Sequence, residues 1–244
     1  MVAIPKKVTE RLSKSVTKYK RVLKKALDRD VNESDTVSII TDMLSDVFGF
    51  DKYSEVTSEY CIKSTYCDLA VTVDDKIVYL LEAKAIGISL KDNHLKQAIN
   101  YGAHEGIPWI VLTNGIEWYV YKIEVKGQVS HELVCSLNFL ELSPRKKEDQ
   151  IKLFVLCREG VTKDVLDIVH EKAQCVNKFV IADILASEAV VPVVRRVLRK
   201  MSPGLKVETS EIEEIIKEEI IKREIIESEK SKPAQSKVRK ALKK

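Results

Sequence analysis

Two acidic residues and a lysine lie at the ends of two predicted strands, where they could carry out phosphodiester chemistry. Asp68 comes early in one apolar segment, and Glu82-Ala83-Lys84 ends the next. Residues two apart in a strand share a face, so Glu82 and Lys84 should point the same way, and Asp68 can face Glu82 if the strands pair. The preceding run, Ile77–Leu81, is apolar throughout, as in a strand buried on both faces. Charges at the end of such a strand are costly unless they are paired or bound to a metal.

These side chains are typical of a site that hydrolyses phosphodiester bonds. Asp68 and Glu82 could hold Mg2+ or Mn2+, with the backbone carbonyl of Ala83 and waters completing the coordination. The metal would polarise the phosphate and lower the pKa of a bound water, while Lys84 would orient or deprotonate that water. A strand-end ion pair is the alternative, because the acid-x-Lys pattern is common. The chain has two others, Asp74-x-Lys76 and Glu124-x-Lys126.

A predicted helix after these strands could bring a further polar side chain to the same place. The helix is expected over residues 92–104, and Gln97 and Tyr101 lie four residues apart on it, so they share a face. If the helix packs beside the strand end, Gln97 could reach the bound water or the phosphate. An ordinary polar helix face is the alternative.

The elements around these residues predict an α/β domain followed by helices. Apolar spacing predicts a helix over residues 9–30 and a second one between the cap-type Asn32 and Gly49. Six segments then have the pattern of strands, the last of them an edge strand. They are residues 55–63, 67–73, 77–84, 109–113, 117–125 and 129–137.

Beyond Pro144 the strand pattern stops, and only helical stripes follow. They cover residues 147–157, 163–174, 177–200 and 210–229. Ser210 and Glu213 have the spacing of a capping box for the last helix. Residues 230–244 are basic, contain Pro233 and have few apolar side chains, so we expect a mobile tail.

Charge and composition narrow the possible partners and exclude several classes of protein. Residues 1–30 hold ten Lys or Arg against three acids, and residues 230–244 hold seven and no acid, so the part between them is acidic. Basic ends suit a phosphate-rich partner such as DNA; a solubilising tail and a solvated helix face are the alternative. With 45% apolar residues the chain is not disordered throughout, and no apolar run approaches the ~20 residues of a membrane span. Five cysteines without a C-x-x-C pair and no visible secretory signal predict a cytoplasmic location.

The helical third offers two features that could contact a partner. Arg195 and Arg196 belong to a basic cluster near the end of a predicted helix, where they either complement the helix dipole or contact the DNA backbone. The segment 211–226 carries isoleucine around much of its circumference. We therefore expect it to be either core or a contact with a second copy or a partner subunit.

The order of the motifs resembles a known nuclease family. The motifs are Asp68-Leu-Ala-Val, Leu80-Leu-Glu-Ala-Lys-Ala-Ile-Gly, Gln97-Ala-Ile-Asn-Tyr101 and Trp109-Ile-Val-Leu-Thr-Asn-Gly-Ile-Glu-Trp118-Tyr-Val-Tyr121. Together they resemble the N-terminal nuclease domain of the restriction subunit of type I restriction–modification enzymes, over roughly residues 30–145. That domain belongs to the PD-(D/E)xK superfamily, in the branch with a Gln-x-x-x-Tyr helix. The resemblance implies a restriction-endonuclease-like fold, with a mixed central sheet flanked by helices.

The resemblance also implies roles for individual residues. Asp68 and Glu82 would be metal-binding acids, Lys84 the catalytic lysine, Gln97 the supporting helix residue, and Tyr101 a residue close to the DNA path. Cys67 stands where the motif usually opens with proline, which is a minor departure.

Such folds often add an acid from the first core helix. Glu33 occupies the matching place, although Asp35 or Asp42 could serve instead.

A larger departure from the family concerns the ATP-binding motif. The restriction subunit continues into an ATP-driven motor, but none of the eight glycines here is followed by lysine, so the chain has no Walker A loop.

The sequence therefore predicts three parts: a nuclease-like domain over residues 1–145, a helical appendage over 146–229 and the tail. The expected function is Mg2+-dependent cleavage of DNA, related to restriction or defence and without an ATP motor; repair or processing of branched DNA is also open. The alternative is a non-catalytic or partner-dependent DNA-binding subunit of a restriction or repair complex.

Overall fold

The computed structural model describes residues 3–62 and 65–243 of the chain. They fall into two compact units, Met1–Val169 and His170–Lys244. The end of the expected strand at Lys63 lies outside the described residues. In the described part of the chain, no helix is both long and apolar enough to cross a membrane.

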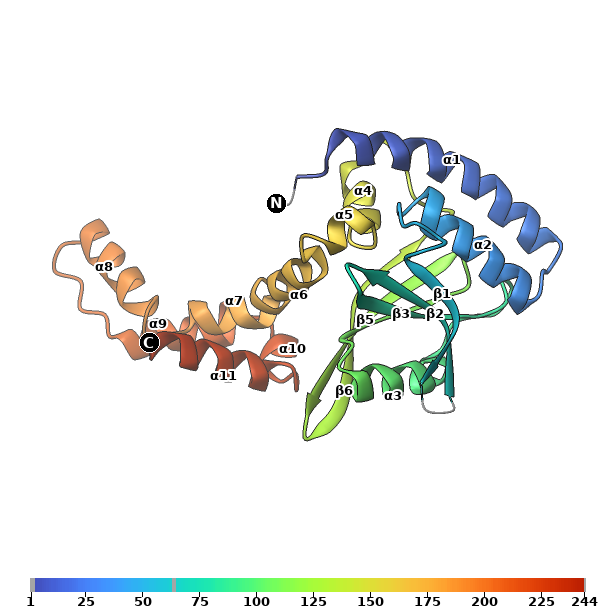
Figure 1. Ribbon diagram of the computed structural model, residues 1–244. Helices are drawn as coiled ribbons and strands as arrows, with labels where there is room; N and C mark the ends of the chain where they lie inside the picture. Colours follow the sequence, from blue (N-terminus) through green and yellow to red (C-terminus); the bar gives the residue numbers. More distant parts are fainter. Residues whose placement is uncertain (1–2, 63–64, 244) are drawn as a thin grey trace. The chain divides into compact units, whose positions relative to one another are not determined.

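A mixed six-stranded sheet forms the centre of the first unit (Figure 1). Its strands are β1 (Val56–Ile62), β2 (Thr65–Val73), β3 (Lys76–Ala83), β4 (Trp109–Thr113), β5 (Glu117–Lys126) and β6 (Gln128–Asn138). They lie side by side in chain order. The pair β3 and β4 is parallel, and the other neighbouring pairs are antiparallel. The predicted strands are thus confirmed within one or two residues at each described end.

Local turn chemistry explains why these strands pair as they do. Asp74 and Asp75, between β2 and β3, have φ of 50° and 61°, the left-handed values that a tight hairpin turn requires. Asn114 and Gly115 join β4 to β5; Gly115 has φ of 83°, and the Asn114 carboxamide oxygen accepts two backbone hydrogen bonds. The parallel step from β3 to β4 instead needs a crossover. It is made by the 3-10 turn η1 (Asp92–Leu95) and helix α3 (Lys96–Glu105).

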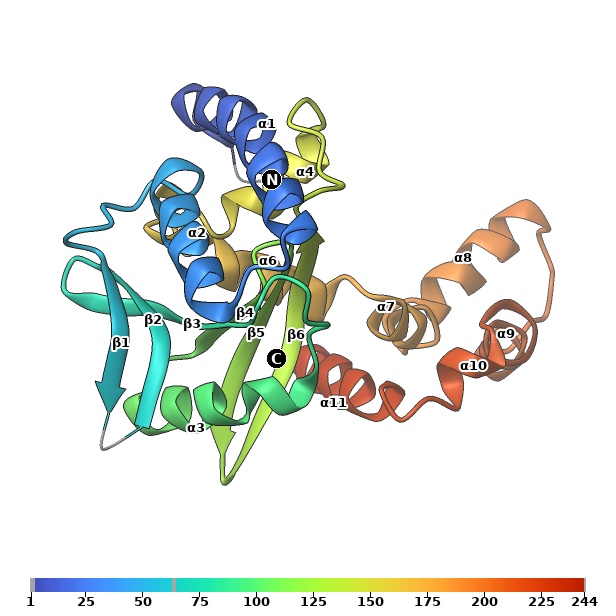
Figure 2. The same ribbon diagram turned by 90° about the vertical axis from the view of Figure 1, so that its right-hand side faces the viewer.

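Helices cover both faces of the sheet, as Figures 1 and 2 show. On one face lie α1 (Lys6–Asp28), α2 (Glu33–Asp46) and α4 (Lys147–Phe154). Their apolar stripes join alternate side chains of the strands, such as Leu69 and Leu81, in one large buried cluster. On the other face α3 packs on the intervening side chains, such as Ala70 and Leu80. Two apolar layers therefore hold β3 rigidly in the middle.

The first unit extends beyond the boundary at residue 145 that the sequence predicts. Helices α4, α5 (Arg158–Val161) and the start of α6 (Val165–Cys175) bury Leu153, Phe154 and Leu166 in the large cluster. The Arg11 guanidinium in α1 also makes two hydrogen bonds to the Glu159 carboxylate, of 2.6 and 2.7 Å. These contacts place residues 146–169 with the sheet and not with the helical appendage.

The second unit contains short helices in place of the two longer ones that the sequence predicts. They are α7 (Lys178–Leu185), α8 (Val191–Met201), α9 (Thr209–Ile215), the π-turn η2 (Ile216–Ile220), α10 (Arg223–Ile226) and α11 (Ser231–Leu242). A continuous helix over 177–200 is wrong because Pro192, which lacks an N–H, starts a new helix at its first turn.

The continuous helix over 210–229 is also wrong. It breaks at Ile221, whose backbone is extended, after the π-turn. The capping box is wrong as well, since Ser210 lies inside the first turn of α9 and the cap position is Glu208. The mobile tail is wrong over residues 231–242, which form α11. Pro233 sits in its first turn, where no backbone donor is needed, and Ala234 and Val238 are buried next to Val180.

Candidate active site at the end of β3

The lysine and the two acids named from the sequence lie together at the C-terminal end of β3. The Nζ atom of Lys84 lies 2.8 Å from Oε1 of Glu82 and donates a hydrogen bond of 2.7 Å to the backbone carbonyl of Ala83. The side chains of Glu82 and Lys84 therefore do point the same way, as their spacing predicts. Both are largely buried, with 10% and 19% of their side-chain surface exposed.

Asp68 is tied to the same place from the neighbouring strand. The antiparallel register pairs Leu69 with Leu81, which brings Asp68 opposite Glu82. Oδ2 of Asp68 accepts a hydrogen bond of 2.7 Å from the backbone N–H of Ala83. This bond fixes the carboxylate of Asp68 across the end of β3, beside the carboxylate of Glu82.

Glu33 adds a third carboxylate from the first turn of α2. Its Oε2 lies 3.7 Å from Nζ of Lys84, and 49% of its side chain is exposed. Of the other two acids considered from the sequence, Asp42 pairs with Lys52 at 3.1 Å. The backbone N–H of Asp35 donates to the Asn32 side chain, which caps the helix. Of these three acids, Glu33 is therefore the one beside Lys84.

The local charges leave the acids short of compensation. Burial raises the pKa of Asp68, and the hydrogen bond from Ala83 only partly offsets this. Burial likewise raises the pKa of Glu82, while its contact with Lys84 lowers it less. For Lys84, burial lowers the pKa, but the contacts with Glu82 and the other carboxylates outweigh burial and raise it. Lys84 stays charged, and the site would gain from a further cation.

The donor atoms at this site are hard oxygens. They are the carboxylates of Asp68, Glu82 and Glu33 and the carbonyl of Ala83. Among residues 3–62 and 65–243, no three His, Cys, Asp or Glu side chains are already gathered as a metal site. A cation here would take its protein ligands from these carboxylates and the carbonyl, a hard-oxygen set that Mg2+ accepts when waters fill the remaining positions.

Thr36 is a structural residue beside the site that sequence reasoning missed. This buried side chain sits in the first turn of α2; its Oγ1 donates to the carbonyl of Asn32 at 2.7 Å and accepts from the N–H of Ile86 at 3.1 Å. It thereby ties the chain just after Lys84 to the turn that carries Glu33. A threonine near a helix start has no pattern that distinguishes this role.

The other predicted residues of the first unit lie on α3 and at the start of β2. Gln97 lies in the first turn of α3 with its side chain exposed. Tyr101, expected near the DNA path, is 4% exposed and packs in the apolar layer under α3. Cys67 beside Asp68 is fully buried, and burial raises the pKa of its thiol to about 12, so it is a core residue.

Arg195 and Arg196 belong to α8 in the second unit. Arg195 donates a hydrogen bond of 2.7 Å to the carbonyl of Val207 and lies 3.4 Å from Glu208. Arg196 is exposed. The structure thus gives Arg195 a local structural contact and leaves Arg196 on the surface.

Comparison with known proteins supports the resemblance seen in the motifs. Residues 39–135 match a family model described as the type I restriction enzyme R protein N terminus. The matched segment contains Asp68, Glu82, Lys84, Gln97 and Tyr101. No curated protein and no solved structure matches the chain significantly. The resemblance expected from the motifs is therefore confirmed over residues 39–135, where the chain matches the N terminus of the type I restriction enzyme R protein.

Proposed function

We propose that this chain is a metal-dependent deoxyribonuclease of a restriction system. The observation that carries the proposal is the meeting of Asp68, Glu82 and Lys84 at the end of β3, inside the segment that matches the restriction family. The parallel crossover through α3, which leaves this strand end beside a helix on each face, supports a restriction-endonuclease-like fold.

Charge balance favours a divalent cation as the cofactor. Three carboxylates and one ammonium leave a formal charge of −2, and burial raises the pKa of two of the acids. Mg2+ or Mn2+ bound by Asp68, Glu82, Glu33 and the carbonyl of Ala83 would neutralise that charge. When bound, it would polarise the phosphate and acidify a water molecule.

The residues of the chain would divide the remaining work between them. Lys84 already contacts Glu82 and Ala83, so its ammonium can shift from these oxygens to a water or to the phosphate when a cation takes its place. There it would orient the attacking water and offset negative charge on the phosphate. Gln97 would support the water or phosphate from α3, and Glu33 would hold Lys84 from α2.

The broader setting of the activity is part of the same proposal. The substrate would be DNA, cut in a restriction or defence role in the cytoplasm. The reaction itself would not use ATP, since no glycine of the chain precedes a lysine as a Walker A loop requires. A partner subunit could bind through the helical second unit.

Plasmid cleavage tests the proposal. Supercoiled plasmid is incubated with the protein and Mg2+ or Mn2+, without ATP, and nicked and linear products are measured. Asp68→Asn, Glu82→Gln and Lys84→Met should each lower the cleavage rate by at least about 100-fold, the effect typical of lost acid–base or electrostatic groups.

A matched control comes from the second acid-x-Lys pattern on the same strand pair. Asp74→Asn and Lys76→Met change the same residue types at the other end of β3, in a hairpin turn where Asn is also tolerated. These variants should cleave like the wild type. Equal cleavage by all variants would refute the assigned site. Absence of cleavage by the wild type, with DNA binding intact, would instead favour a partner-dependent DNA-binding subunit.

A further inference from the structure

Helix α11 carries a strongly basic face on the surface of the second unit. A hollow of about 320 Å³ is lined by four cationic side chains and two neutral ones. They are Lys232, Gln235, Ser236, Arg239, Lys240 and Lys243. Residues 230–243 contain no acid, and all six lining residues are exposed. This face therefore differs from an ordinary solvated helix, on which charges of both signs alternate.

Packing on the opposite side keeps this face turned to solvent. Ser231, Ala234 and Val238 are buried, and Ala234 and Val238 pack in a small cluster with Val180 of α7. Nζ of Lys237 also donates a hydrogen bond of 3.1 Å to the carbonyl of Gln174. Since α11 is anchored at three successive turns, its cations keep a fixed spacing and are not spread over a flexible tail.

Three of the four cations lack an acidic partner in the part of the chain that the structure describes. Across the described residues, no carboxylate lies within ion-pairing distance of Lys232, Arg239 or Lys240. Exposed basic side chains of this kind lower their free energy by meeting an anion. The helix rise of ~1.5 Å per residue spreads the face over about 16 Å, the length of about five phosphates along one DNA strand.

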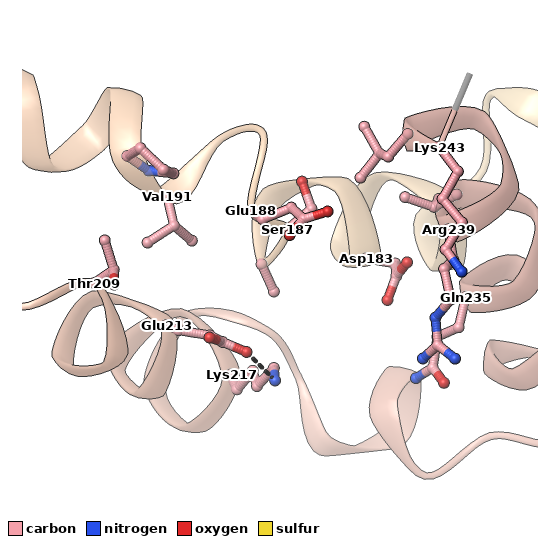
Figure 3. A pocket seen from close by; sticks show the side chains of 14 residues that line it. Asp183, Ser187, Glu188, Val191, Thr209, Glu213, Lys217, Gln235, Arg239 and Lys243 are labelled. Carbon is pink, nitrogen blue, oxygen red and sulfur yellow. Dashed lines mark hydrogen bonds and ion pairs between the residues drawn. The ribbon is translucent and has the colours of Figure 1, made fainter.

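A larger neighbouring hollow has the opposite character. It measures about 640 Å³, and Arg239 and Lys243 border it, but Asp183, Glu188 and Glu213 also line it (Figure 3). These acids would repel phosphate. The side of α11 that carries Lys232, Ser236 and Lys240 is thus the side that suits an anionic polymer.

We infer that the basic face of α11 is a second, sequence-independent binding site for the phosphate backbone of duplex DNA. The choice of DNA as the polymer rests on the proposed function. The site would raise the affinity of the chain for DNA through release of counterions and would take no part in cleavage.

DNA binding in the full chain tests this inference. The protein carries Glu82→Gln and EDTA is present, so cleavage plays no role, and a fluorescent 30-base-pair duplex is titrated at several salt concentrations. Replacing Lys232, Arg239, Lys240 and Lys243 by Gln should weaken binding at least 10-fold at low salt. The salt dependence should weaken: the magnitude of the negative slope of log K against log salt should decrease by about 2 to 4, since each phosphate contact contributes about 0.9.

Two further variants separate this effect from a loss of folding or of general charge. A matched control replaces Lys178, Lys206, Lys217 and Lys222 by Gln; these residues are exposed in the same unit, and the affinity should stay within about 2-fold. Replacing Lys232, Lys240 and Lys243 by Arg keeps the charge and should preserve both affinity and slope.

Any of three results would overturn the inference. The first is an equal loss in the α11 variant and in the matched control. The second is a loss for duplex RNA or for vesicles of anionic lipid with none for DNA. The third is an α11 variant whose salt slope is unchanged. The plasmid assay separates this result from the proposed function, because a chain that cleaves normally but keeps its salt slope would contradict the α11 site alone.

Discussion

The two units of the chain hold their charged residues in different ways. In the first unit, Glu82 and Lys84 lie at the end of a strand that is buried between two apolar layers. The backbone of Ala83 holds Asp68 and Lys84 by hydrogen bonds through its N–H and its carbonyl. In the second unit, cations lie on exposed helix faces above two small apolar clusters. Bond-breaking chemistry needs atoms held in place, whereas attraction to a charged polymer needs only charge in the right region. The proposed catalytic residues thus lie on a rigid strand end, and the proposed DNA-binding cations lie on an exposed helix.

The core of the first unit should be the most sensitive part of the chain. Trp118 is 1% exposed, contacts the ring of Phe48 at 5.0 Å and donates a hydrogen bond of 2.9 Å to the carbonyl of Gly115. Trp118→Ala should lower the free energy of unfolding by about 3–5 kcal/mol, because the cavity cannot close. Denaturant unfolding followed by circular dichroism measures this. A loss below about 1 kcal/mol would show that the layers are not tightly packed.

A core substitution in the second unit should cost less free energy of unfolding and should leave the first unit folded. Ile216 is buried in a cluster of five buried side chains, so Ile216→Ala should cost about 2 kcal/mol, at the low end for such a change. Both tryptophans, Trp109 and Trp118, lie in the first unit. In Ile216→Ala, part of the circular dichroism signal of the helices should therefore be lost at a lower denaturant concentration. The unfolding midpoint followed by tryptophan fluorescence should stay unchanged. An equal shift of both signals would mean that the units unfold as one.

The ion pair between Arg11 and Glu159 tests where the first unit ends. Burial raises the pKa of Glu159, but the hydrogen bonds from Arg11, a backbone hydrogen bond and the positive charges of Arg11 and Lys7 together outweigh it, so the pKa lies below its ordinary value. Such a carboxylate stabilises the fold above its unfolded pKa, and the contribution disappears as pH falls through the lower folded value. Glu159→Gln should cost about 1–2 kcal/mol at pH 7 and less near pH 3. A cost that does not change with pH would contradict the pairing.

Sequence patterns predicted the sheet well because its determinants are local. The alternation in β2 and β3, the Asp74-Asp75 turn and the Asn114-Gly115 turn each specify structure within a few residues. The spacing of Glu82 and Lys84 likewise predicted that their side chains share a face, and a strand-end ion pair was the alternative. The hydrogen bond from Ala83 to Asp68, and the link from Thr36 to Ile86, depend on register and on helix docking, which no short pattern encodes.

The helical unit was harder to predict for a physical reason. Its apolar residues recur often enough to suggest long helices, but Pro192 and the extended backbone at Ile221 divide them. The order of α11 was missed because it depends on contacts distant in sequence: Ala234 and Val238 pack against Val180, and Lys237 donates a hydrogen bond to the carbonyl of Gln174. Helices this short depend more on packing than on their own propensity.

Binding of Mn2+ to the full chain tests the central claim most directly. Calorimetric titration of the wild type should show Mn2+ binding that weakens at least 10-fold in Glu82→Gln and in Asp68→Asn. Lys84→Met should bind Mn2+ as tightly as the wild type or more tightly, because the ammonium that shares Glu82 and Ala83 is gone, and Asp74→Asn should be unchanged. Equal Mn2+ affinity in the wild type and in both acid variants would contradict the account, since the two carboxylates would then hold no metal.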